Sequence, residues 1–174
     1  MNIFLIGYRG TGKTTVGTLV ARELDWSLVD ADEELERRAG KTIAQIFADD
    51  GEQVFRDVES EVIAILSDRD QTVISLGGGA VMRSQNREAI VGRGHIVWLQ
   101  ADVETIAARV LGDESTAARR PNLTAKGGLQ EIREILDERA PIYQQTCDWA
   151  VDTEGKTPEQ VADEIVRWIR GSAR

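Results

Sequence analysis

The sequence contains one cysteine, one histidine and no long apolar run. With Cys147 alone, no disulfide can form within the chain, which favours a reducing compartment. His95 begins a strand-like run, which favours a structural role over acid–base or zinc chemistry. No segment approaches the roughly 20 apolar residues of a membrane span, and Met1–Gly7 lacks the basic region and cleavage site of a signal peptide. These absences predict a soluble cytoplasmic protein.

Positive charge is also scarce, because 21 Lys and Arg face 30 Asp and Glu, a formal net charge of −9. Such an acidic surface repels nucleic acid and anionic membranes, so neither is expected as a partner. An anionic ligand must then be held by a local cluster of Arg, Lys or backbone N–H groups. The length, 174 residues, predicts a single domain spanning 1–174.

Short apolar runs alternate with helical stretches along the chain. Because each intervening segment but the last part is long enough for a crossover helix, the pattern predicts an α/β fold with a parallel sheet covered on both faces. Capping boxes at Thr42–Gln45 and Thr157–Gln160 mark two helix starts. The five expected strands are 2–6, 27–29, 72–76, 95–99 and 149–151.

A phosphate-binding loop follows the first strand. Gly7-Tyr-Arg-Gly-Thr-Gly-Lys-Thr14 matches G-x-x-x-x-G-K-[ST] in full, between an expected strand and the helix Lys13–Leu24. In such loops backbone N–H groups surround phosphate at a helix N-terminus. Lys13 is expected to reach the β- and γ-phosphates of a nucleotide, and the Thr14 hydroxyl to ligate Mg²⁺.

Two carboxylates, Asp30 and Asp32, end the second expected strand. The carboxyl ends of parallel strands face the ligand crevice, so these groups could help to hold a metal and accept a proton from an attacking hydroxyl. Alternatively, Asp32 could simply cap a helix over Glu33–Ala39. The residues alone leave both interpretations open.

Three consecutive glycines, Gly77, Gly78 and Gly79, directly follow the third strand. Because glycine in series costs conformational entropy, this run suggests a ligand lying against the main chain. Arg56 lies on a helix, where a solvated i,i+3 ion pair with Glu59 is the simpler interpretation.

The segment 112–128 fits neither helix nor strand, and a segment of this length in a compact domain is often a lid. It contains Arg119 and Arg120, which could close over a transferring phosphoryl group or merely solubilise the loop. Arg139 could bind a ligand, or be a favourable cation near a helix C-terminus, because Pro141 strains the helix there.

Taken together, these motifs resemble the shikimate kinase family. The likeness runs in family order and at family spacing from the first residues to the end of the chain. It is carried by Gly7–Thr14, Asp30-Ala-Asp32, Phe55-Arg56 with Glu59, Ser75–Ala80, Arg120-Pro121 and Arg139–Tyr143.

The resemblance implies a nucleoside-monophosphate-kinase-like P-loop NTPase fold, three-layer α/β/α with strand order 2-3-1-4-5. It implies an enzyme that uses ATP and Mg²⁺ to phosphorylate the 3-hydroxyl of shikimate, with 32–66 as the substrate-binding region and 112–128 as the lid. We also expect the protein to be a monomer. The family usually places two apolar residues after the lid Arg-Pro, but here Asn122-Leu123 follow, and Arg119 could replace Arg120 as the functional arginine.

Roles are carried over position by position. Asp32 orients or deprotonates the acceptor hydroxyl, Arg56 and Arg139 grip the shikimate carboxylate, and Gly77–Gly79 supply backbone contacts. Phe47 and Phe55 form part of an apolar substrate wall. The implied catalytic residues are Lys13, Asp32 and Arg120, and the implied nucleotide-binding residues are Gly10, Thr11, Gly12, Lys13, Thr14, Thr15, Arg109, Arg120 and Lys156.

Two other functions stay open. A related small-acid kinase, such as a gluconate kinase, would share the fold and the phosphate loop. An ATP-binding regulator without catalysis would also keep the loop, although retention of Lys13, Thr14 and Asp32 argues against it.

Overall fold

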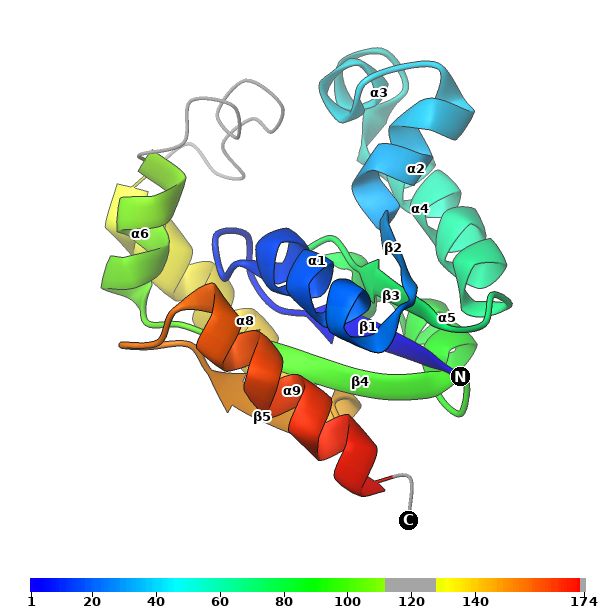
Figure 1. Cartoon of the computed structure of the whole chain (residues 1–174). Helices are drawn as coiled ribbons and strands as arrows, with labels where there is room; N and C mark the ends of the chain where they lie inside the picture. The colour runs from blue at the N-terminus through cyan, green and yellow to red at the C-terminus, as the bar shows by residue number, and fades with distance from the viewer. Residues whose placement is uncertain (112–127, 173–174) are drawn as a thin grey trace.

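A computed structural model describes residues 1–111 and 128–172 of the chain. Five parallel strands form one sheet in the order β2-β3-β1-β4-β5 (Figure 1). The predicted parallel sheet and its strand order are therefore confirmed. The strands are β1 (Asn2–Ile6), β2 (Ser27–Asp30), β3 (Thr72–Ser75), β4 (Gly94–Gln100) and β5 (Trp149–Asp152).

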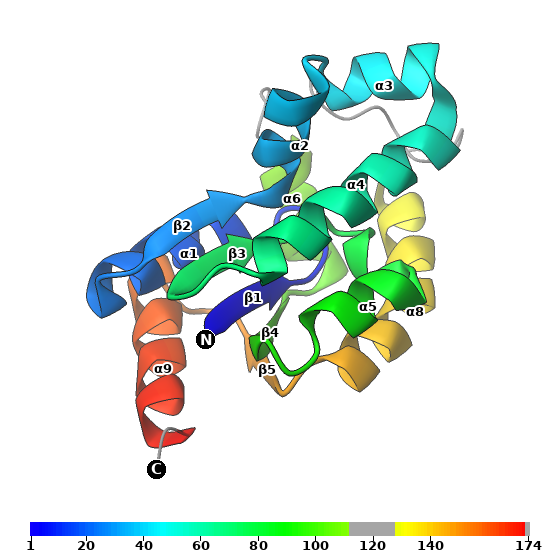
Figure 2. The same ribbon diagram turned by 90° about the vertical axis from the view of Figure 1, so that its right-hand side faces the viewer.

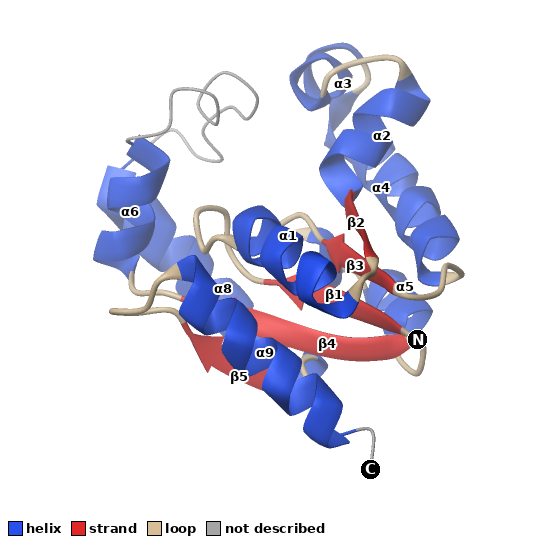
Figure 3. Cartoon of the chain, viewed as in Figure 1, coloured by secondary structure: helices blue, strands red, loops and turns tan. Residues whose placement is uncertain are grey.

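Helices cover both faces of the sheet, as Figures 2 and 3 show. One face carries α1 (Lys13–Leu24) and α9 (Pro158–Ser172). The other face packs against α4 (Gly51–Ser67), α5 (Ser84–Ile90) and α8 (Gly128–Thr146), with the short 3-10 helix η1 (Ala80–Met82). The remaining helices are α2 (Ala31–Ala39), α3 (Ile43–Asp49) and α6 (Val103–Leu111).

Alternation along β1 explains the three layers. Ile3 and Leu5 lie in the core beneath α1 and α9, while Phe4 and Ile6 lie in the core on the opposite face. All four side chains are buried, as expected for a central strand of a parallel sheet with period-2 side chains. The central strand is therefore packed on both faces, and the loops that follow the strands extend from the edge of this packed sheet.

Both predicted capping boxes are present. The Thr42 hydroxyl accepts from the Gln45 N–H while the Gln45 side chain accepts from the Thr42 N–H. Thr157 and Gln160 form the same reciprocal pair at the start of α9. These local signals set the helix starts as predicted.

Two helix boundaries differ from prediction. Helix α2 begins at Ala31, and its cap is Asp30, whose carboxylate accepts from the N–H groups of Asp32 and Glu33. The interpretation of Asp32 as the cap is therefore wrong. Helix α8 continues past Pro141 to Thr146, so Arg139 does not lie at a helix C-terminus.

In the part of the chain that the structure describes, no helix combines the length and apolar character needed to cross a membrane.

Candidate functional site

The phosphate loop connects β1 to α1 at the carboxyl ends of the strands. Gly12 caps α1 with φ +90, a left-handed conformation that favours glycine, and no side chain caps this helix. The first N–H groups of α1 are thus left for a ligand, and the helix dipole favours an anion there. The loop therefore fits a nucleotide phosphate.

Lys13 lies over this loop. Its ammonium donates to the carbonyl oxygens of Gly7 (2.8 Å) and Tyr8 (2.9 Å), and the residue is 8% exposed. Thr11 turns inward instead, with its hydroxyl donating to the Tyr8 carbonyl at 2.8 Å. When a nucleotide binds, the Lys13 ammonium can therefore donate to phosphate oxygens in place of these two carbonyl oxygens.

Oxygen atoms gather beside the loop. The Thr14 hydroxyl donates to Asp30 Oδ2 at 2.8 Å and lies 3.5 Å from the Ser75 hydroxyl. Mg²⁺ prefers oxygen ligands and is commonly held by one or two carboxylates together with substrate phosphates. This donor set fits such an ion, although among residues 1–111 and 128–172 no three His, Cys, Asp or Glu gather as a metal site.

The Asp30 carboxylate therefore has two structural tasks. One oxygen caps α2 and the other accepts from Thr14. Sequence reasoning grouped Asp30 with Asp32 and did not separate them. Spacing alone does not separate them, because either carboxylate could accept from N–H groups two and three positions ahead.

The three glycines of the turn after β3 are each closely approached by a different side chain. A Cβ atom added at Gly77 would lie 2.8 Å from Asp32 Oδ1. At Gly78 it would lie 3.5 Å from an Arg139 nitrogen, and at Gly79 2.8 Å from both terminal nitrogens of Arg56. The turn thus brings together the predicted substrate residues Asp32, Arg56 and Arg139.

The phosphate loop reaches the same turn. A Cβ atom at Gly78 would lie 3.4 Å from the Gly7 carbonyl oxygen and 3.5 Å from the Arg9 backbone nitrogen. The glycine turn and the phosphate loop therefore adjoin, which is the arrangement that direct phosphoryl transfer requires.

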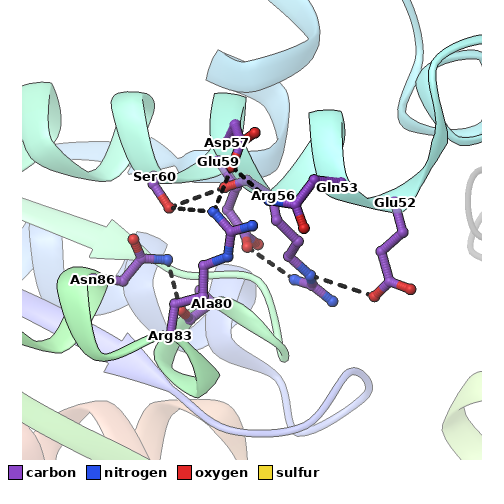
Figure 4. A network of polar contacts seen from close by, with 9 residues as sticks. All are labelled: Glu52, Gln53, Arg56, Asp57, Glu59, Ser60, Ala80, Arg83 and Asn86. Carbon is purple, nitrogen blue, oxygen red and sulfur yellow. Dashed lines mark hydrogen bonds and ion pairs between the residues drawn. The ribbon is translucent and has the colours of Figure 1, made fainter.

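Arg56 and Glu59 pair within 2.8 Å on α4, and Figure 4 shows the pair in its network with Glu52. The prediction of a solvated pair is wrong, because the side chains are 17% and 5% exposed. Burial raises the pKa of Glu59, although the positive charges of Arg56, Arg83 and Arg139 act in the opposite direction. A second ion pair, Arg83 with Asp57, ties α4 to the segment after η1.

The two phenylalanines that the resemblance assigns to the substrate wall, Phe47 and Phe55, form an aromatic pair. The rings of Phe47 and Phe55 lie 4.6 Å apart between centroids, and the Arg56 guanidinium lies 5.0 Å from the Phe55 ring. Stacking on an aromatic face suits guanidinium. The aromatic pair therefore adjoins Arg56, whose guanidinium approaches the glycine turn at Gly79.

The two implied adenine-site residues differ in placement. Arg109, on α6, donates to the Gly10 carbonyl oxygen at 3.2 Å and so adjoins the phosphate loop. Lys156 follows β5, and its ammonium pairs with Glu164 of α9 at 3.0 Å. Arg119, Arg120 and most of the expected lid, 112–127, lie outside the described residues.

Comparisons with known proteins agree with this geometry. The family model described as shikimate kinase matches residues 9–170. A shikimate kinase of Rhodopirellula baltica is 39% identical over 166 residues, covering 95% of this chain and 89% of that protein. One of Thermodesulfovibrio yellowstonii is 40% identical over 166 residues, covering 95% and 93%.

A solved structure gives the same result in three dimensions. The shikimate kinase from Acinetobacter baumannii in complex with shikimate superposes with a TM-score of 0.91 at 34% identity. The match covers 98% of this chain and 93% of that one.

Proposed function

The chain belongs to the shikimate kinase family, and from that premise we propose that it transfers the γ-phosphoryl group of ATP to the 3-hydroxyl of shikimate. The products are shikimate 3-phosphate and ADP, in the biosynthesis of chorismate and aromatic amino acids. The observation that carries the proposal is the convergence of Asp32, Arg139 and Arg56 on three successive glycines beside the phosphate loop.

The nucleotide binds at the loop. Backbone N–H groups of Gly10–Thr15 surround the phosphates, Lys13 meets the β- and γ-phosphates, and Arg109 and Lys156 line the adenine site. Mg²⁺, held by Thr14 and the neighbouring oxygens, would neutralise part of the phosphate charge.

Binding of the shikimate carboxylate explains why two arginines lie together in an acidic protein. Arg56 and Arg139 approach the glycine turn from different helices, α4 and α8. A guanidinium binds carboxylate through two parallel hydrogen bonds. The pair holds the shikimate carboxylate, while Gly77–Gly79 allow the ring to lie against the main chain.

Asp32 accepts the proton of the attacking hydroxyl. That oxygen then bonds to the γ-phosphorus as the bond to the ADP oxygen breaks, so no covalent enzyme intermediate is needed. We propose Arg120 as the lid arginine that neutralises the transferring group, with Arg119 as the alternative. The enzyme is proposed to act as a cytoplasmic monomer, without nucleic-acid or membrane partners.

The substrate is tested by coupled ADP release with Mg-ATP. We expect release to depend on shikimate and to be negligible with gluconate, with a nucleoside monophosphate or without an acceptor. Equal or faster turnover with gluconate would make the chain a different small-acid kinase. Nucleotide binding without release for any acceptor would support a regulator.

Gly79→Ala tests whether Arg56 binds the shikimate carboxylate. The backbone at Gly79, with φ −96, accommodates alanine, but the new methyl group would displace the Arg56 guanidinium. We expect the shikimate KM to rise about tenfold with kcat less affected, as for lost uniform binding. Gly171→Ala is the control, because nothing lies within 4 Å of a Cβ there. An unchanged shikimate KM in Gly79→Ala would remove Arg56 from the binding site.

A further inference from the structure

One buried tyrosine joins the substrate arginine of α8 to the glycine turn. Tyr143 is fully buried, and its hydroxyl donates to the Gly78 carbonyl oxygen at 2.5 Å. The Arg139 guanidinium lies near the same hydroxyl, and its charge and side-chain interaction lower the pKa of Tyr143 against the effect of burial. A tyrosine hydroxyl has one donor and two acceptor positions, so a single group can serve both neighbours.

Helical spacing makes this arrangement rigid. Arg139 and Tyr143 lie four residues apart on α8 and so share one face. The Tyr143 ring packs 5.5 Å from the Trp98 ring on β4, in the core beneath the sheet. Burial raises the pKa of Tyr143 to about 12, so the hydroxyl keeps the proton that it donates at neutral pH.

The Arg139 guanidinium is enclosed on a second side by the phosphate loop. It lies 6.0 Å from the ring centroid of Tyr8, which is buried and packs against residues of α6 and α8. A Cβ atom at Gly78 would lie 3.5 Å from an Arg139 nitrogen. The Tyr143 hydroxyl donates to the carbonyl oxygen of this same glycine and interacts electrostatically with the guanidinium.

We propose that Tyr143 is a positioning residue for shikimate, because its hydroxyl holds the Arg139 guanidinium beside the Gly78 main chain before the acid binds. The proposal rests on the proposed function and deepens it. A flexible arginine loses rotamer freedom when it grips a carboxylate. A hydroxyl that restrains it in advance lowers that cost, which appears as tighter binding.

Tyr143→Phe tests the proposal, since it keeps the buried ring and removes only the hydroxyl. We expect the shikimate KM to rise about tenfold, as for loss of a hydrogen bond to a charged group, while the ATP KM changes less than about twofold. Ser67→Ala is the matched control. It removes a buried hydroxyl that donates to Ala64 within α4, beside Asn2 at the amino end of β1.

A purely structural tyrosine would behave like the control, with a lower Tm and an unchanged shikimate KM. If Tyr143→Phe is partly unfolded at 25 °C by its thermal melt, the constants are measured at about 10 °C, where destabilised domains are closer to maximal stability. A shikimate KM within about twofold of wild type would overturn the proposal.

A double-mutant cycle shows whether Tyr143 acts through Arg139. We expect Tyr143→Phe to change the shikimate KM by less than about twofold in an Arg139→Ala background, because the group that it positions is gone. If Tyr143→Phe still raised the shikimate KM about tenfold in that background, the proposal would be overturned. Shikimate-dependent turnover of the wild-type enzyme would still support the proposed function. Absence of shikimate-dependent turnover in wild type would instead overturn the proposed function, and this inference with it.

Discussion

Lys13→Ala is expected to abolish shikimate-dependent ADP release, with kcat lower by roughly 10³-fold or more, as for cations that meet charge on a transferring phosphoryl group. The ammonium lies over the phosphate loop, within 2.9 Å of two of its carbonyl oxygens. Within the loop no other side chain is a lysine, and Arg9 is the only other cation. A neutral, short side chain at position 13 would leave the γ-phosphate without its central cation.

The fold is expected to survive this change. The loop is shaped by glycines with positive φ and by Thr11, which bonds back to Tyr8. Arg93→Ala is a control for loss of one positive charge, because Arg93 is exposed and pairs with Asp68 away from the glycine turn. Steady-state kinetics and a thermal melt of both variants decide the matter. Wild-type kcat in Lys13→Ala would contradict the assignment of the phosphate loop.

Much of the fold could be predicted because its signals are local or nearly so. The apolar runs gave strands whose positions differ from the structure by one residue at most, and the alternation with helices gave a parallel sheet. The glycine loop is recognisable because its backbone conformation demands those residues at fixed spacing. The strand order came from the family resemblance and not from periodicity.

The parts that were missed depend on contacts between distant segments. An i,i+3 pair such as Arg56 with Glu59 looks solvated on an isolated helix. In the fold the pair is buried, and the glycine turn, which comes later in the chain, lies against both side chains. The bond from Tyr143 to Gly78 joins residues 65 positions apart, so no local pattern indicates it. Pro141 suggested a helix end, but α8 packs against β4 and η1 and continues for five more residues.

Asp32 and Asp30 illustrate the same limit at short range. Either carboxylate satisfies the pattern of a cap, and the sequence offered the task to Asp32. The structure gives it to Asp30, and it places Asp32 Oδ1 against the glycine turn instead. With the cap at Asp30, Asp32 has no capping task, and its carboxylate is placed to act in the chemistry of the site.

Asp32→Asn is therefore expected to lower kcat by roughly 10²–10⁴-fold, the range for lost general-base help, while Tm stays close to wild type. Asparagine keeps the shape of the side chain but cannot accept the hydroxyl proton. Asp68→Asn, at an exposed position paired with Arg93, is the control for loss of one carboxylate.

Asp30→Ala supplies the contrast in stability. It removes the cap of α2, which costs about 1 kcal/mol, and a domain of this size then melts roughly 2–4 °C lower. Kinetics with shikimate at saturating ATP, together with thermal melts of Asp32→Asn and Asp30→Ala, separate the two carboxylates.

If Asp32→Asn instead kept the wild-type kcat and melted at a lower temperature, the proton acceptor would have to be another group in the site. The nearest other carboxylate is Glu59, which lies 3.4 Å from the Cβ position of Gly77, but its bond to Arg56 disfavours that role. Such a result would leave the glycine turn as a binding element only.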